Sequence, residues 1–472
     1  MKLNTEQKRT QISSSHRLIG LTKSIRHKLD TDSGYGKNFE LIEPDYFLNG
    51  ILPKLLSKLN TTISKRQTAL LRRIRNKASV YGVTRLTANE YATETLFDSY
   101  FFKNNEKYVN RIDTANLIRS SIKNYNKIML VIPLLSRKPI SPIKNKGFYP
   151  DLGEINTLLR CAKLVKTLIN VSGYNCELII LADGNKYNRA CQTPLDITTA
   201  YQSALQYWID ALGIGDCVKL VDYESWVCEG NDSNWIERRE SIYADMYKTI
   251  SITYDSMFFH NDLSGSMNAM KGHEMGDQLA YTFWSIITSV NYRSLFSCLD
   301  YKDIFSNREV QNFYISFIAS LEYSIGKVKK SHLFSRQLVG DQAFRSAEIV
   351  KQMSVEAWEA AKKYVAISLT DRKLNTIYQK TPTAIKLTIH GKKCEFNFIT
   401  TTAKDFSKTA QHTVGGLGDV NGNMVIDYKY RIERESDNEV KTYIARTVEN
   451  GNEFNPLREM SLINQPIYYT SK

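Results

Sequence analysis

The sequence predicts an α/β fold with a Rossmann-like parallel sheet at its core, and this prediction depends on residues 128–223. An apolar run at residues 128–135 is followed by a basic loop, a helical pattern at residues 152–171 and a second apolar run at residues 176–182. This order is typical of a βαβ unit, and continuous apolar strands are typical of a parallel sheet covered on both faces. Ligands of such sheets bind beyond the carboxyl ends of the strands, where the loops after residues 135 and 182 begin.

Helical patterns precede this core. Residues 1–40 are polar, and we expect the start of the chain to fray. Apolar residues recur at helical spacing over residues 46–81, and residues 88–125 continue the helical pattern. Basic residues crowd the polar side of the 46–81 helix. They fit a nucleic-acid or membrane-surface helix, but no aromatic residues interleave with them, which favours a solvated face.

The core pattern continues beyond residue 183. We predict a helix over residues 197–212, a third strand over residues 218–222 and a helix over residues 355–378. Between them, residues 224–350 are helical and aromatic-rich. A Gly/Ser/Asn-rich loop at residues 260–276 is long enough to be a lid or a disordered insertion.

The end of the chain changes to a β pattern. Alternating residues predict strands at 384–390, 395–399, 424–430 and 442–444. Residues 391–393 are predicted as the turn between the first two strands. The segment Asp419–Asn423 faintly resembles a calcium-binding loop, but it lacks the closing glutamate and the flanking helices. Asn421-Gly422 is therefore predicted as a hairpin turn.

These patterns predict three parts of the chain. Residues 1–125 form a mainly helical N-terminal region, and residues 126–350 form the α/β core with a helical insertion. Residues 351–472 form a C-terminal α+β portion that completes the active site.

Composition limits the partners. The 472 residues carry a formal net charge of +14, which indicates an anionic partner such as nucleic acid, a membrane surface or a phosphorylated small molecule. A basic surface without a partner fits equally well, because the basic residues are scattered through the chain. Neither the N-terminus nor any apolar run matches a signal peptide or a bilayer span. We expect a soluble cytoplasmic protein with no membrane partner.

Common cofactor and metal signatures are absent from the sequence. The seven cysteines form no CxxC pair and the seven histidines no HExxH motif, so we expect no metal site and a reducing compartment. No GxGxxG follows the first strand, and neither a P-loop nor a GxSxG elbow occurs. These absences argue against nicotinamide, P-loop and α/β-hydrolase chemistry.

Two predicted loops carry candidate site residues. Lys138 and Lys144 follow the first strand, where lysines can hold a phosphate, although a solvated loop fits the same spacing. Asp183-Gly184 is a carboxylate on a tight turn at the end of a buried strand. It can orient an amine or act as a base, or it can be an ordinary turn aspartate.

Two histidines and a lysine near the C-terminus are further candidates. Lys386, Thr388 and His390 alternate along one predicted strand and therefore share a face. That face fits an anion cradle, but the wet side of a half-buried sheet is the commoner case. His412 lies in a Gly- and Thr-rich loop and can shuttle protons near neutral pH.

Residues 133–154 resemble the isocyanide synthases, the pyoverdine/dityrosine biosynthesis family. The positions that match the pattern of that family are Pro133, Lys138, Lys144, Gly147, Pro150, Asp151 and Glu154. Later segments are also similar to it, namely residues 178–184, Asp196 with Tyr201, residues 382–390 and residues 410–414. The resemblance covers about residues 125–225 and 355–430. The departures from it are Ile140-Ser141 for Pro-Asn, Ala182 for Ser, Lys386 for Arg and Gln411 for Trp.

The resemblance implies a reaction and a set of roles. The α-amine of an amino acid, often aromatic, condenses with ribulose 5-phosphate and becomes an isocyanide, and no cofactor is implied. The implied catalytic residues are Asp183, His390 and His412, and the implied substrate-binding residues are Lys138, Lys144, Asp151, Gly184 and Lys386. The implied partners are these small molecules and a downstream oxygenase of the same pathway.

Two other functions fit the sequence. One is a diverged, non-catalytic binder of a phosphorylated metabolite or of nucleic acid, although the scattered charge argues against nucleic acid. The other is a different lyase or transferase that acts on an amino acid and a phosphosugar.

Overall fold

The fold is described by a computed structural model, and the description covers most of residues 52–289 and the segments that complete the sheets. The described residues are 39–42, 49, 52–83, 86–103, 105–136, 150, 152–191, 195–231, 233–260, 266, 269–270, 272–289, 347–389, 394–400, 415–420, 423–428, 444–445 and 468–471.

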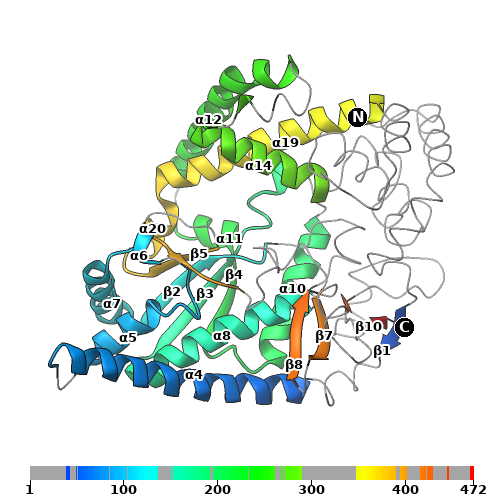
Figure 1. The fold of residues 1–472 in the computed structure, drawn as a ribbon. Helices are drawn as coiled ribbons and strands as arrows, with labels where there is room; N and C mark the ends of the chain where they lie inside the picture. The colour runs from blue at the N-terminus through cyan, green and yellow to red at the C-terminus, as the bar shows by residue number, and fades with distance from the viewer. Residues whose placement is uncertain are drawn as a thin grey trace.

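A five-stranded parallel sheet lies at the centre, in the order β4-β3-β2-β5-β6 (Figure 1). The strands are β2 (Ile128–Pro133), β3 (Cys176–Ala182), β4 (Val218–Asp222), β5 (Ile385–Thr388) and β6 (Phe396–Asn397). The predicted α/β fold is confirmed, and so are the predicted strands at 128–135, 176–182 and 218–222.

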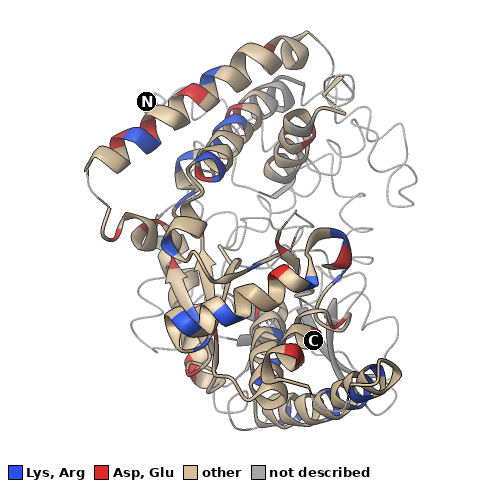
Figure 2. Ribbon diagram, turned by 90° about the vertical axis from the view of Figure 1, so that its left-hand side faces the viewer, with Lys and Arg blue, Asp and Glu red and all other residues tan. Residues whose placement is uncertain are grey.

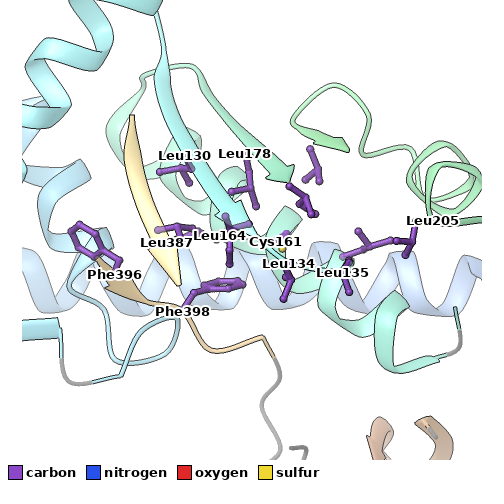
Figure 3. Close-up of a cluster of buried hydrophobic side chains, with 14 of the residues drawn as sticks. Leu130, Leu134, Leu135, Cys161, Leu164, Leu178, Leu205, Leu387, Phe396 and Phe398 are labelled. Atoms are coloured by element: carbon purple, nitrogen blue, oxygen red, sulfur yellow. The ribbon is translucent and has the colours of Figure 1, made fainter. Parts of the chain in front are cut away.

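Both faces of the sheet are covered, as continuous apolar strands require. On one face, Leu130 and Leu178 belong to one buried cluster with Leu164 of α8 (Leu152–Ser172) and Leu205 of α10 (Leu195–Ala211) (Figure 3). On the other face, strand residues pack with α11 (Tyr223–Cys228) and with residues of α7 (Arg111–Tyr125) and α20 (Thr376–Lys380). The carboxyl ends of the strands remain as the edge where loops can build a site.

A helical layer lies above this edge in the view of Figure 1. It contains α12 (Ser233–Phe259), α14 (Glu274–Ser289) and α19 (Ala347–Leu374). Phe258 of α12 stacks on Trp358 of α19 with ring centroids 4.4 Å apart. The buried Lys362 of α19 pairs with Asp255 at 2.9 Å, which ties the two helices together. A short helix, α9 (Asn188–Cys191), follows β3.

β5 and β6 differ from the sequence prediction. The alternation at residues 384–390 predicted a half-buried strand with one wet face, but all four β5 residues are buried. β5 pairs in parallel with β2 of the core sheet, and β6 pairs in parallel with β5 rather than as a hairpin. The polar residues Lys386 and Thr388 are buried because the strand lies inside a parallel sheet. Residues 390–393, which include the predicted turn, lie outside the described residues.

The remaining β structure is antiparallel. β7 (Gly415–Val420) pairs with β8 (Asn423–Tyr428), and Val420 faces Asn423 across the pair. The antiparallel pairing on either side of Asn421-Gly422 fits the predicted hairpin, and these two residues themselves lie outside the described residues. A second sheet joins β1 (Phe39–Ile42), β10 (Tyr468–Ser471) and β9 (Ile444–Ala445).

Helix α4 (Leu52–Val80) runs along the lower edge of the molecule, as the 46–81 pattern predicted (Figure 1). Its apolar side packs on α8 and on α5 (Ala88–Leu96). Asp98, which is fully buried, pairs with Arg66 and with Arg73 of α4, the latter at 3.1 Å. This carboxylate therefore holds α4 in place.

No helix in the described part of the chain is long and apolar enough to cross a membrane.

The Asp98 anchor can be tested by truncation. Asp98→Ala removes the buried carboxylate that pairs with the part-buried Arg66 and the more exposed Arg73, so we expect the free energy of unfolding to fall by about 2 kcal/mol. Urea denaturation measures this loss. Asp245→Ala, at an exposed position of α12, is the matched control and should change stability by less than about 0.5 kcal/mol. Equal effects of the two substitutions would show that Asp98 is not an anchor.

Candidate active site

The turn after β3 brings the ends of three strands together. Asp183 follows β3 and accepts a hydrogen bond from Ser136, which follows β2. Asn185 donates a hydrogen bond of 2.9 Å to Asp222 at the end of β4. The carboxyl edge of the sheet therefore carries linked polar groups, as the parallel topology predicts.

Gly184 allows this close approach. A Cβ atom at this position would lie 2.3 Å from the carbonyl oxygen of Ser136 and 2.7 Å from Cγ2 of Thr198. The first contact is with backbone, which cannot rotate away. The turn thus requires glycine because it has no space for a Cβ atom, and not because the φ angle is unusual.

Asp371 of α19 is the centre of a buried polar cluster beside this turn. Its Oδ2 atom lies 2.7 Å from Nζ of Lys186 and accepts a hydrogen bond of 2.8 Å from the hydroxyl of Tyr223. Its Oδ1 atom lies 3.4 Å from Nε of Arg239. Arg239 also makes two hydrogen bonds of 2.7 Å to Glu224. One carboxylate therefore links the β3 turn, α11, α12 and α19.

Electrostatics fix the protonation states of this cluster. Burial alone would lower the pKa of Lys186, but the charge interactions with Tyr223, Asp371 and Asp183 outweigh it and raise that pKa above its usual value. Burial also raises the pKa values of Tyr187 and Tyr223. Lys186 is therefore a cation and both tyrosines are neutral near pH 7, so none of the three serves as a base there.

Two tyrosines form an aromatic wall next to Lys186. The rings of Tyr187 and Tyr364 stack at a centroid distance of 3.8 Å and an interplanar angle of 10°. The ammonium group of Lys186 lies 4.8 Å from the Tyr187 ring and 4.3 Å from the Tyr223 ring. Cation–π attraction at these distances adds to the ion pair with Asp371.

Lys386 has a different environment. Its ammonium group donates to the carbonyl oxygens of Ile377 and Thr381, at 3.0 and 2.9 Å, and to the hydroxyl of Thr381 at 2.5 Å. Burial lowers the pKa of Lys386 to about 7, and a weaker interaction with Glu395 opposes this shift. All three ammonium donors are thus used by the protein, and the predicted role in anion binding stays a prediction.

A second buried pair lies at the start of α8. Glu154 is fully buried and accepts a hydrogen bond of 3.2 Å from the hydroxyl of Tyr201 in α10. Both residues belong to the pattern that the sequence shares with the isocyanide synthases. The pair joins the two helices that follow the loops after β2 and β3.

The structure brings together some of the predicted site residues. Asp183 and Gly184 share the β3 turn, and Lys386 lies on β5, on the far side of β2 from β3. The other predicted site residues, namely Lys138, Lys144, Asp151, His390 and His412, lie outside the described residues. Their roles remain predictions.

Sequence reasoning missed Lys186, Tyr223, Arg239 and Asp371. Lys186 carried a usable signal, since it follows Asp183 by three residues in the same loop. Asp371 carried none, because it lies within a helical pattern 148 residues from Tyr223. Within the described residues, no group of three or more His, Cys, Asp or Glu side chains is placed to hold a metal ion.

Comparison with known proteins identifies the central segment. Residues 118–275 match the family of pyoverdine/dityrosine biosynthesis proteins. The predicted family is confirmed over this segment. It contains β2, β3, β4 and the loops at their carboxyl ends, whereas β5 and Asp371 lie beyond it.

The chain is also similar to a protein of known structure. The chain is similar to the PvcA protein from Pseudomonas aeruginosa, with 14% sequence identity and a TM-score of 0.45. The match covers 81% of this chain and 99% of that chain. No curated protein sequence matches the chain.

Substitution of Gly184 tests the close approach at the turn. Gly184→Ala places a methyl group against the Ser136 carbonyl, so we expect a loss of about 1–3 kcal/mol of unfolding free energy. Gly215→Ala is the control, because the nearest atoms to its Cβ lie 3.7 and 3.8 Å away. Thermal denaturation compares the two variants. A Gly184→Ala variant as stable as Gly215→Ala would contradict the geometry.

The buried Lys386 predicts a pH dependence of stability. Its pKa is about 7 in the folded chain and about 10.4 in the unfolded chain, so the unfolded chain binds more protons between these values. The free energy of unfolding should therefore rise with pH from about 7 to about 10, by at most about 1.4 kcal/mol per unit from this group. Urea denaturation at several pH values measures the slope.

Lys386→Met should reduce that slope, because the titrating group is gone. Lys373→Met, at an exposed position of α19, should leave the slope unchanged. The same slope in both variants would mean that Lys386 keeps an ordinary pKa.

Proposed function

We propose that the protein is an isocyanide synthase-like enzyme that joins the α-amine of an amino acid, preferably aromatic, to ribulose 5-phosphate. The family match over residues 118–275 carries the proposal, because it covers three core strands and the loops at their carboxyl ends. A biosynthetic role follows from the family. The identities of the two substrates and of the isocyanide product are what we propose beyond that role.

The proposed chemistry needs cations for the phosphosugar and proton-transfer groups for imine formation and elimination. We assign Lys138, Lys144 and Lys386 to the phosphosugar, and Asp151 and Gly184 to the lining of the substrate site. The proton-transfer groups are Asp183, His390 and His412, whose side-chain types suit transfer near neutral pH.

The position of Asp183 supports its role. Its carboxylate accepts one hydrogen bond, from Ser136 to Oδ1, and no other hydrogen bond to this carboxylate occurs among the described residues. Oδ2 is thus left to accept a proton or to orient an amine. Asp183 also lies near Lys186, and their charge interaction contributes to raising the pKa of Lys186.

Lys386 combines two properties that suit the proposed site. It lies on the strand next to β2, and its pKa of about 7 lets it gain or lose a proton near neutral pH. As a cation it can attract the phosphate, and as a neutral amine it can accept a proton.

A product assay tests the function. Purified protein is incubated with ribulose 5-phosphate and each of the twenty amino acids, and a tetrazine traps any isocyanide for mass spectrometry. A trapped adduct would support the proposal and identify the amino acid. If no adduct forms but ribulose 5-phosphate still raises the melting temperature, the chain acts on the phosphosugar by another reaction. If neither occurs, a non-catalytic binder replaces the enzyme.

Two variants test the residue roles in that assay. Lys138→Ala and His390→Ala should each reduce turnover by about 100-fold or more, because each removes a charge or a proton carrier. Lys248→Ala and His273→Ala, both at exposed positions, are the controls and should keep full turnover. Folded Lys138→Ala and His390→Ala proteins with full turnover would remove these residues from the mechanism.

A further inference from the structure

Helix α4 presents a line of cations to solvent. Its 29 residues include no Asp or Glu. Five exposed basic residues follow one another at separations of four, seven, seven and three positions, which places them on one side of the helix. They are Lys54, Lys58, Lys65, Arg72 and Arg75, and we call them the cationic stripe. At 1.5 Å per residue the stripe is about 32 Å long.

Most of this stripe has no ion-pair partner within the described part of the chain. Two carboxylates pair with other residues of α4, namely Asp98 with Arg66 and Arg73, and Glu94 with Lys77. These pairs lie on the flank toward α5. In the described part of the chain, Lys54, Lys65, Arg72 and Arg75 make no ion pair, so these four cations remain available to a partner. Figure 2 shows the distribution of Lys and Arg over the fold.

Apolar side chains stand exposed where the helix ends. Val80 is 82% exposed, Tyr81 73% and Val83 41%. Three large apolar residues within four positions form what we call the apolar tip. Exposed apolar side chains that lie together commonly mark an interaction site, and tyrosine is enriched at membrane–water interfaces.

An open depression lies on the stripe between its middle and the tip. Lys65, Thr68, Arg72 and Arg73 are among the residues that line it. Thr68 donates its hydroxyl hydrogen to the Ser64 carbonyl and Arg73 pairs with Asp98, so Lys65 and Arg72 are the cations that this hollow offers to a phosphate or carboxylate group.

We propose that α4 binds the surface of an anionic lipid bilayer. A charged bilayer attracts a line of cations, and its headgroup region accepts the apolar tip. Nucleic acid fits less well, because no aromatic residue interleaves with the cations and the valines of the tip have no role on a phosphate backbone. The helix lies along the edge of the molecule, where a flat surface can reach it (Figure 1). This proposal does not depend on the proposed enzyme activity.

Vesicle flotation with the full chain tests the proposal. We expect the protein to float with phosphatidylcholine–phosphatidylserine vesicles but not with pure phosphatidylcholine, and to be released by high salt. Lys65→Gln/Arg72→Gln/Arg75→Gln should lower the partition coefficient by about 100-fold, since each cation near an anionic surface contributes about fivefold. Val80→Ser/Tyr81→Ser should lower it by about tenfold without a change of charge.

The control has the same change in net charge. Arg238→Gln/Lys248→Gln/Lys373→Gln alters exposed residues of α12 and α19, away from α4. It should bind vesicles like the unaltered protein. Equal losses in the two triple variants would show that net charge alone causes binding, and would overturn the proposal. It would also fail if anionic vesicles do not bind, or if single-stranded RNA binds through the stripe while vesicles do not.

Discussion

The ion pair between Lys186 and Asp371 holds the carboxyl edge of the sheet against the helical layer. Lys186 belongs to the turn after β3, and Asp371 to the last turns of α19. Tyr223 and Arg239 bind the same carboxylate from α11 and α12. Loss of Asp371 would remove the ion-pair partner of a buried ammonium group and the shared acceptor of Tyr223 and Arg239, so the relative position of these elements depends strongly on one side chain.

The central strands β2 and β3 were predictable because their apolar runs are almost uninterrupted, and such runs are visible in a single sequence. β5 was not predictable in the same way. Lys386 and Thr388 alternate with apolar residues, and this alternation is normally the mark of a strand with one wet face. In the structure Lys386 is buried because backbone carbonyls of the α20 region accept its hydrogen bonds. A sequence pattern cannot contain that information, since the acceptors are backbone atoms of a neighbouring segment.

Some residues of the candidate site could also be predicted from the sequence, and others could not. Asp183 and Gly184 could be predicted, because they directly follow a buried strand and the end of a parallel strand is where ligands bind. The close contact between Gly184 and Ser136 could not be predicted, because it depends on how the turns after β2 and β3 lie in the folded chain. Asp371 could not be predicted, since only the folded chain brings α19 to the β3 turn. The site is therefore assembled from segments inside the family match, which ends at residue 275, and from α19 and β5 beyond it.

Three buried cations near the core differ in their hydrogen-bond and ion-pair partners, and the pKa of each cation depends on those partners. Lys186 faces carboxylates and stays protonated. Arg160 is buried against the carbonyls of Tyr100 and Ile399, and burial lowers its pKa, but a guanidinium keeps its charge in proteins. Lys386 has carbonyl and hydroxyl partners and, in the described part of the chain, no carboxylate at ion-pair distance, so burial lowers its pKa to about 7. Of these three groups, Lys386 is the one whose pKa burial brings close to neutral pH.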